Sequence, residues 1–228
     1  MNWIDTSILL FLNQFAQRSP RFDEFVTFLS DCNLLKGGVI VGLMWWLWFD
    51  TENVRRKREV LLAALIASVP ALILAKTLTV VTFRTRPLNE ARLAFHVPHC
   101  VTPADWKQLS SFPSDHAVLF FAMAAGIFIA SRRAGWFALF YVSAFICLPR
   151  MYLGEHYATD ILTGAAIGII SVCLANLPRI RQPLTHWSLR LLEANPSSFY
   201  FMAFLVLYQV VELFEPMIKM GKFIYHLA

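Results

Sequence analysis

The sequence predicts an all-α protein, a polytopic membrane bundle of six transmembrane helices preceded by interfacial helices at the N-terminus. Hydrophobic residues make up 57% of the 228-residue chain and charged residues only 15%. That balance is typical of helical membrane proteins and excludes an ordinary soluble domain. The basic residues gather in short loops between long apolar stretches. The net charge of +5 therefore indicates orientation in a membrane and not nucleic-acid binding.

Residues 1–33 are expected to form two interfacial helices. Asp5 and Thr6 can cap the first helix, and the pair Ser19-Pro20 ends it. Apolar residues at helical spacing then mark a second helix. Because both helices carry polar residues throughout, we expect them to lie in the interface and not to span it. The chain's first residues lack a basic stretch, so no cleavable signal peptide is expected.

Residues 34–216 are expected to form the six-span core, and residues 217–228 a short C-terminal tail. Several of the apolar stretches are shorter than the roughly 20 residues that a span needs. The shortfall disappears if the polar clusters at their ends belong to the helices. The six stretches are Leu34–Phe49, Val60–Phe83, Ala117–Ser131, Ala134–Pro149, Ile161–Pro178 and Ser197–Phe214.

Basic residues assign the two ends of this bundle to opposite sides of the membrane. They follow the first, third and fifth spans, at residues 55–58, 132–133 and 179–190. These loops share one face, which the positive-inside rule makes cytoplasmic. Both termini and the loop from Arg84 to Pro113 then lie outside. Cys32 and Cys100 fall on this outer side, so a disulfide between them stays open.

Three polar clusters lie on the predicted outer face. An ionisable side chain at membrane depth is costly, so it indicates function by default. Four cations, two histidines and a carboxylate together predict a site that binds a phosphate and attacks it. The clusters are Lys76 with Arg84-Thr85-Arg86-Pro87, the run Ser110-Ser111-Phe112-Pro113-Ser114-Asp115-His116, and Arg150 with His156 and Asp160.

His156 and Asp160 carry the reactive chemistry in this interpretation. They are four residues apart, so on a helix Asp160 can accept a hydrogen bond from one ring nitrogen of His156. The other nitrogen is then free to act as a nucleophile. The alternative is a structural histidine that caps a span beside a helix-stabilising carboxylate.

The run around His116 begins the third span. Ser114 can present its hydroxyl and backbone N–H to an anion at the helix start. His116 can donate a proton to a leaving oxygen, because imidazole titrates near neutral pH. The alternative is an ordinary N-cap.

The cations at the end of the second span are Lys76, Arg84 and Arg86. They can bind a phosphate, because arginine binds phosphate bidentately and lysine binds it as a point charge. The alternative is that these cations snorkel to the lipid headgroups, and this suffices for Arg84. Lys76 is deeper. His96 and His99 in the outer loop can bind metal in principle, but exposed loop residues are the favoured interpretation.

The motifs Lys…Arg-Pro, Pro-Ser-x-His and Arg-x5-His-x3-Asp, in this order, resemble the three-part signature of the type 2 phosphatidic acid phosphatase superfamily. The similarity runs from Lys76 to Asp160. The N-terminal Ser-Pro-x-Phe-Asp and the form Ser-Phe-Pro-Ser-Asp-His are most similar to the bacitracin-resistance branch, the undecaprenyl-pyrophosphate phosphatases.

The resemblance implies a role for each matched residue. His156 would attack phosphorus and form a phosphohistidine, with Asp160 polarising it. His116 would protonate the leaving group and then assist the attack of water. The resemblance implies no metal and no other cofactor, because cations neutralise the charge that spreads over the phosphoryl oxygens. The residues that would hold these oxygens are Lys76, Arg86, Ser114 and Arg150.

Three positions depart from the family pattern. Lys76 precedes Arg86 by ten residues, whereas seven is usual, and one additional helical turn keeps it on the same face. Asp115 replaces the commoner glycine, so we expect its carboxylate to be paired, with an arginine or a backbone N–H. Pro149 stands where a serine often precedes the arginine.

The predicted function is therefore hydrolysis of undecaprenyl pyrophosphate to undecaprenyl phosphate at the outer face of the bacterial cytoplasmic (inner) membrane. Phosphatidylglycerophosphate, phosphatidic acid and lipid A phosphate stay open as substrates. A protein that only binds or transports anionic lipid is the alternative from another class. It would need Lys76 and Arg86 but neither His156 nor Asp160. A vanadate-dependent haloperoxidase shares the motifs, but its chemistry does not need a bilayer.

Overall fold

The computed structural model describes residues 2–99, 101–106 and 109–213, and within these ranges every regular element is helical and no strand occurs. The all-α prediction is confirmed. The predicted tail, residues 217–228, and Cys100 of the candidate disulfide lie outside the described residues. The α-helices are α1 (Trp3–Asn13), α2 (Pro20–Asp31), α3 (Val39–Trp48), α4 (Val54–Val81), α5 (Asp115–Ala130), α6 (Arg132–Tyr141), α7 (Leu148–Tyr152), α8 (Ala158–Ala175), α9 (Pro178–Ala194) and α10 (Pro196–Val211). Shorter helical segments are the π-helices η1 (Leu34–Gly38) and η4 (Val142–Cys147) and the 3₁₀-helices η2 (Pro87–Asn89) and η3 (Pro103–Trp106).

The described residues of the six predicted spans are largely helical, but the helices differ in length. Within the described residues three stretches are long and apolar enough to cross a membrane, namely α4, α8 and the run Arg132–Tyr152. A fourth is reached if α2 and Leu34–Trp48, which meet at a 58° bend, form one broken span. α5 and α10 have 16 residues each, fewer than the roughly 20 of a typical span. The count of six spans stays a prediction.

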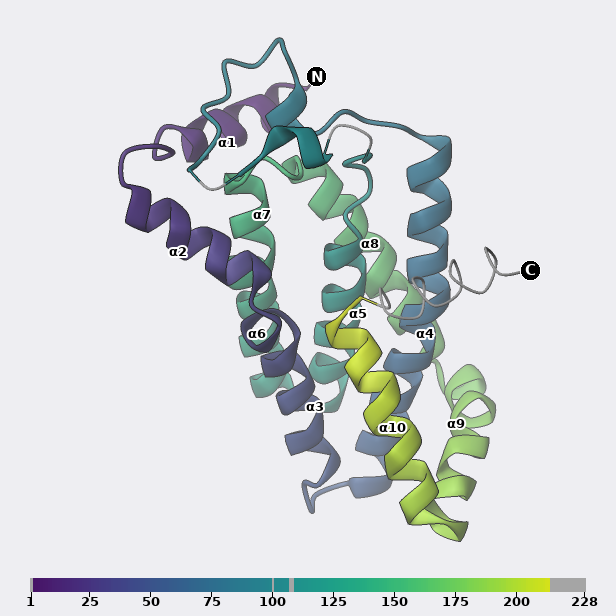
Figure 1. The fold of residues 1–228 in the computed structure, drawn as a ribbon. Coiled ribbons are helices and arrows are strands. Elements are labelled where there is room, and N and C mark those ends of the chain that lie inside the picture. The colour runs from purple at the N-terminus through teal and green to yellow at the C-terminus, as the bar shows by residue number, and fades with distance from the viewer. Residues whose placement is uncertain (1, 100, 107–108, 214–228) are drawn as a thin grey trace, which may run out of the picture.

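α5 lies at the centre of the bundle and packs against α4, α6 and α8 (Figure 1). Its buried side chains are almost all apolar. α8 can approach α5 closely because Gly164 and Gly168 have no side chain. A Cβ at Gly168 would lie 2.2 Å from the carbonyl oxygen of Val118. Small residues at such contacts are typical of membrane helices, and here they fix the start of α5 against the start of α8.

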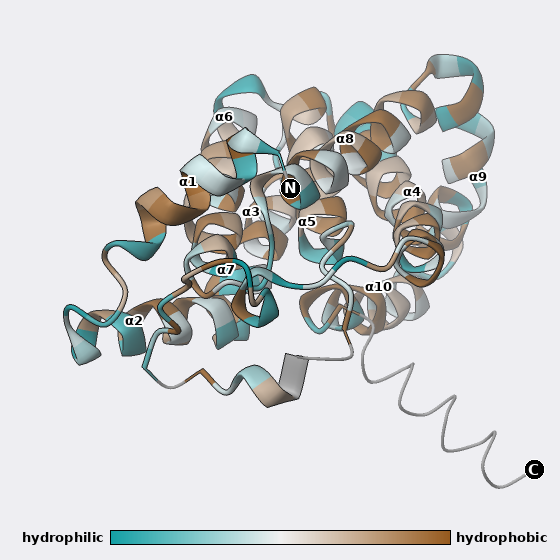
Figure 2. Ribbon diagram, turned by 90° about the horizontal axis from the view of Figure 1, so that it is seen from above, coloured by the Kyte–Doolittle hydropathy of each residue, from teal (hydrophilic) through white to brown (hydrophobic). Residues whose placement is uncertain are grey.

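The polar clusters lie at the end of the bundle that carries the N-terminus, at the top of Figure 1. α4 ends there, α8 begins there, and the segment between α4 and α5 crosses this end. The turn between α3 and α4 lies at the opposite end, as does α9. Seen from above, hydrophilic stretches mark the segment that crosses the bundle, in front of largely hydrophobic helices (Figure 2).

The N-terminal helices hold this crossing segment. Asn13 donates a hydrogen bond through Nδ2 to the carbonyl oxygen of His96 at 2.7 Å and accepts one from the His96 backbone N–H at 2.8 Å. Gln17 donates to the carbonyl oxygen of Val97 at 2.8 Å. The start of α1 is capped by Asn2, whose side chain accepts a bond from the Asp5 N–H, so the predicted cap at Asp5 and Thr6 is wrong.

Candidate active site

A cavity of about 320 Å³ lies at the end of the bundle that carries the polar clusters. Its walls come from α2, η1, α4, α5 and α7 and from the segments that precede α5 and α8. Five of the seven predicted site residues line it, although they are spread over 81 positions of the sequence, from 76 to 156. They are Lys76, Arg86, His116, Arg150 and His156.

His156 is buried at the inner side of this site, with 2% of its surface exposed. Its Nδ1–H donates to the carbonyl oxygen of Ser111 at 2.7 Å, so the predicted hydrogen bond to Asp160 is wrong. The expected four-residue spacing requires a helix, but α8 begins only at Ala158, after the histidine. The carbonyl nevertheless selects the tautomer in which Nε2 keeps its lone pair.

The charge state of His156 also suits a nucleophile. Burial and then the neighbouring guanidinium of Arg86 hold the pKa of His156 well below its ordinary value, with Arg150 acting in the same direction. The imidazole is therefore neutral at physiological pH. A neutral ring with a free Nε2 lone pair can attack an electrophilic phosphorus atom.

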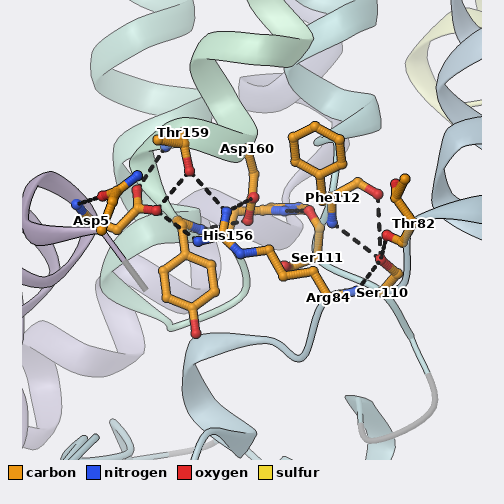
Figure 3. Close-up of polar contacts among 11 residues, drawn as sticks. Asp5, Thr82, Arg84, Ser110, Ser111, Phe112, His156, Thr159 and Asp160 are labelled. Atoms are coloured by element: carbon orange, nitrogen blue, oxygen red, sulfur yellow. Dashed lines mark hydrogen bonds and ion pairs between the residues drawn. The ribbon is translucent and has the colours of Figure 1, made fainter.

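Asp160, four residues after His156, is fully buried. One carboxylate oxygen accepts a bond from Arg84 at 2.5 Å, and the other accepts the Tyr157 backbone N–H at 2.8 Å (Figure 3). Arg84 also donates to Thr159 Oγ1 at 2.8 Å, and its guanidinium lies 3.9 Å from the centre of the Tyr157 ring. The sequence suggested that Arg84 only snorkels to the lipid headgroups, but in the structure it is bound to these protein groups. It holds the start of α8.

Asp5 also belongs to this site, although the sequence predicted only a helix cap at this position. Its carboxylate has no exposed surface and accepts a bond from Arg84 at 2.7 Å. It also accepts the backbone N–H of Thr159 at 2.9 Å and the Thr159 hydroxyl at 2.7 Å (Figure 3). The acidic residue in the first turn of α1 resembled an ordinary cap, so only the tertiary contact identifies it.

Ser114 is fully buried and does not line the cavity. Its hydroxyl accepts the backbone N–H of Ala117 at 3.4 Å, and its own N–H donates to the carbonyl oxygen of Asp160 at 3.2 Å. Ser114 thus serves as the N-cap of α5 and joins the starts of α5 and α8. Its contact with a phosphate stays a prediction.

Asp115 is paired, as expected. The backbone N–H partner is confirmed, but the cation is Lys76 and not an arginine, and the His116 ring is a further partner. Lys76 Nζ lies 2.5 Å from one carboxylate oxygen. The other oxygen accepts the backbone N–H of His116 at 2.8 Å and its Nδ1–H at 3.0 Å. Thr79, on α4 like Lys76, stands seven residues before Arg86, where the family pattern has its lysine, and it also lines the cavity. Lys76 is thus held by Asp115 at the cavity, with half of its side chain exposed.

His116 directs its second nitrogen away from Asp115. Nε2 is buried and, among the described residues, has no hydrogen-bond partner. An unpartnered buried nitrogen beside a polar cavity is available to a bound oxygen. The Asp115 carboxylate accepts the Nδ1–H and so fixes the orientation of the ring, as a third group orients an acid or base in a catalytic site.

Glu155 is an acidic residue of the cavity that pairs with two of the predicted cations, much as Asp115 pairs with Lys76. One of its oxygens lies 2.5 Å from Arg150 and 4.0 Å from Arg86, and it is 5% exposed. It joins the two arginines at one wall and sets the orientation of the Arg150 guanidinium. Lys36 and Asp31 also line the cavity, and neither belongs to a motif.

Metal ligands do not cluster in the part of the chain that the structure describes, where no group of three His, Cys, Asp or Glu residues converges. His99 lies against α2, with Nδ1 at 2.8 Å from Asp23. The same carboxylate accepts the His99 backbone N–H at 2.9 Å and is hydrogen-bonded by the Tyr152 hydroxyl through its other oxygen. His99 thus fastens the crossing segment to the N-terminal helices.

Comparisons with known proteins agree with this geometry. A family model described as the PAP2 superfamily matches residues 58–179, more than half of the chain. The chain is 28% identical over 186 residues to the bacitracin transport permease protein BcrC of Bacillus licheniformis, covering 80% of this chain and 84% of that protein. It is 27% identical over 148 residues to the undecaprenyl-diphosphatase BcrC of Bacillus subtilis (strain 168), covering 65% and 70%. The crystal structure of Aquifex aeolicus LpxE has the same fold, with a TM-score of 0.50 and 24% identity over 74% of this chain and 92% of that one.

Proposed function

Because the chain belongs to the PAP2 superfamily, we propose that it is a lipid phosphatase that hydrolyses a polyprenyl diphosphate at the cavity described above. The favoured reaction converts undecaprenyl pyrophosphate to undecaprenyl phosphate. The observation that carries this proposal is the convergence of two histidines and two arginines on one cavity. The similarity to a protein named undecaprenyl-diphosphatase supports the choice of substrate.

In the first step, Nε2 of His156 attacks the terminal phosphorus and forms an N–P bond. The bond between this phosphorus and the bridging oxygen breaks, and its electron pair goes to that oxygen. His116, which takes up a proton on Nε2 when the anionic diphosphate binds, donates that proton to the same oxygen, so that polyprenyl phosphate leaves. The Ser111 carbonyl supports the reaction, because its bond to Nδ1–H stabilises the positive charge that develops on the attacking ring.

In the second step, water attacks the phosphohistidine. His116, now neutral, accepts the proton from water, and the N–P bond breaks to release inorganic phosphate and regenerate His156. Arg86 and Arg150 hold the phosphoryl oxygens in both steps. Their guanidinium groups are oriented before the reaction by Glu155 and supply the positive charge that phosphoryl transfer requires. The proposed reaction therefore proceeds without a metal ion.

The site is proposed to face the periplasm or exterior, in a bundle that crosses the bacterial inner membrane six times. The basic residues at the opposite end of the bundle support this orientation. α5 and α10 would complete the six spans, with polar residues at the headgroup level. Alkaline phosphatase fused after Leu93 is expected to be active in cells, and an inactive fusion would reverse the orientation.

The test is phosphate release from undecaprenyl pyrophosphate by the purified protein in EDTA. Wild type is expected to turn over, and His156→Ala to fall to background because the attacking nitrogen is lost. His186→Ala is the matched control, since His186 is exposed on α9 at the opposite end of the bundle. Turnover by His156→Ala at the wild-type rate would discard the nucleophile.

The same assay separates the alternatives. A panel of phosphatidylglycerophosphate, phosphatidic acid and lipid A phosphate ranks the substrates by kcat/KM. A protein that only binds or transports anionic lipid would release no phosphate from any of them. Its lipid binding would depend on Arg86 and be unchanged in His156→Ala.

A further inference from the structure

Lys36 enters the cavity from a part of the chain that carries none of the motifs. It belongs to η1, the π-helix between α2 and α3. It is nevertheless one of the cavity's lining residues, together with both histidines. A π-helical segment is frequently found at functional sites, where it displaces a side chain from regular helical spacing.

The backbone around Lys36 is fixed on both sides. The carbonyl oxygen of Leu35 accepts a hydrogen bond from the Tyr141 hydroxyl at 2.6 Å. Gly37 is packed against α10, where a Cβ would lie 3.0 Å from the Val211 Cα. A 58° bend separates α2 from the helical run Leu34–Trp48, in which Lys36 is the third residue. The fold therefore places this lysine at the cavity with some precision.

The positive charges of the cavity act on both of its histidines. Arg86 acts electrostatically on His156, the nucleophile. Lys36 acts on His116, the proton donor. Arg150 acts on both rings. In an in-line displacement the leaving oxygen lies opposite the nucleophile, so the side of the cavity near His116 faces the leaving group.

The leaving group decides what this side of the cavity must bind. When a lipid phosphate monoester is cleaved, the leaving group is a neutral alcohol. When a diphosphate is cleaved, the leaving group is itself a phosphate monoester with negative charge. A cation next to the proton donor therefore stabilises the leaving group of a diphosphate, and it has no charged leaving group to stabilise when a monoester is cleaved.

We propose that Lys36 binds the second phosphate of a diphosphate substrate, the one that departs with the lipid, and so makes the site selective for diphosphates over monophosphates. The inference rests on the proposed phosphatase function and adds the residue that selects the diphosphate. Lys76, held by Asp115 on α4, lies at the same cavity. Asp31 lines it too and limits its net positive charge.

The experiment compares two substrates with the same lipid tail, farnesyl diphosphate and farnesyl monophosphate, in detergent with EDTA. Lys36→Met removes the charge but keeps the length of the side chain. Its kcat/KM for the diphosphate is expected to fall by about 10- to 100-fold, as for a lost hydrogen bond to a charged group, and that for the monophosphate by less than about threefold. Lys36→Arg should keep most of the diphosphate activity.

Arg55→Met is the matched control, because Arg55 is an exposed cation on the first turn of α4 at the other end of the bundle. It should leave both substrates unchanged. Inhibition gives a second readout. Methylenediphosphonate should inhibit Lys36→Met more weakly than wild type, whereas orthophosphate should inhibit both proteins equally. This comparison decides the question if the monophosphate turns over too slowly to measure.

An equal loss on both substrates, or no loss on the diphosphate, would overturn the role of Lys36 while the phosphatase function stands. Equal inhibition of Lys36→Met and wild type by methylenediphosphonate would do the same. A wild-type protein that releases phosphate from the monophosphate alone would remove the diphosphate assignment. A wild-type protein inactive on both would overturn the proposed function itself.

Discussion

Asp5 offers a test of whether the N-terminal helix is part of the active site. It lies 79 residues from Arg84 and 154 from Thr159, yet its buried carboxylate accepts bonds from both. Asp5→Asn keeps the shape of the side chain but replaces one acceptor oxygen with an NH₂ group. That group faces donors, so at least one of the bonds is lost. Arg84 keeps its second carboxylate partner, Asp160.

The expected loss of stability follows from these contacts. A hydrogen bond to a charged group contributes about 1.5–3 kcal/mol, and removing one partner of a buried ion pair costs about 3–5 kcal/mol. Arg84 is 27% exposed and retains Asp160, so water and the second carboxylate offset part of the loss. We therefore expect about 3 kcal/mol, which for a chain of this size is roughly 6–12 °C in Tm.

The loss should depend on pH. Burial raises the pKa of Asp5, but hydrogen bonds from Arg84 and Thr159 outweigh it and hold the pKa below its ordinary value of 3.8. A carboxyl group with a depressed pKa stabilises the folded state above its unfolded pKa and loses that contribution as the pH falls through the folded pKa. The difference between wild type and Asp5→Asn should be complete above about pH 4 and shrink below it.

The measurement is tryptophan fluorescence on heating, in detergent, from pH 7 downward. Glu24→Gln is the matched control, because it makes the same exchange of carboxylate for amide at an exposed position of the neighbouring helix α2. Phosphate release by Asp5→Asn should also fall, since Arg84 and Thr159 fix the start of α8 beside His156. A change in Tm of less than about 1 °C at pH 7 would refute the reasoning.

Two further predictions concern α5. Gly168→Ala should lower Tm by several degrees, because overpacking costs about 1–3 kcal/mol and the new Cβ would lie 2.2 Å from the Val118 carbonyl oxygen. Gly42→Ala, which meets nothing within 4 Å, is its control, and equal Tm values would contradict the contact. Asp115→Asn should reduce kcat by about 100-fold, within the range of general-acid catalysis, without raising KM, because the carboxylate orients the His116 ring for proton transfer. An unchanged kcat would remove that role.

The sequence could predict which residues line the cavity only where these residues belong to motifs. Arg86, Arg150 and the two histidines each follow or precede an apolar stretch, and the positive-inside rule places these ends on one face. The sequence could therefore predict that they converge. Lys36 was not predictable, because a single lysine near the start of an apolar stretch resembles a snorkelling cation.

Local register was the weaker part of the prediction. The hydrogen bond from His156 to Asp160 assumed a helix through both residues, and the helix begins between them. The carbonyl that replaces Asp160 belongs to Ser111, 45 residues earlier, and no sequence spacing specifies such a contact. The polar clusters were expected to lengthen the short apolar stretches to full spans, but α5 takes in only Asp115 and His116 of its cluster and has 16 residues. Hydropathy marks where apolar residues lie, and it does not show how far a helix continues beyond them.

Arg84 explains why the N-terminal helix carries a buried acid. A carboxylate without exposed surface is unfavourable unless it is paired and hydrogen-bonded. Asp5 and Asp160 are both fully buried, and both pair with this one guanidinium, which lies over Tyr157. Neither carboxylate touches the nucleophile, yet together they fix the residues that follow it. The position of His156 is thus set by contacts from α1 and the α4–α5 segment as well as by its own motif, and the N-terminal helix contributes directly to the geometry of the site.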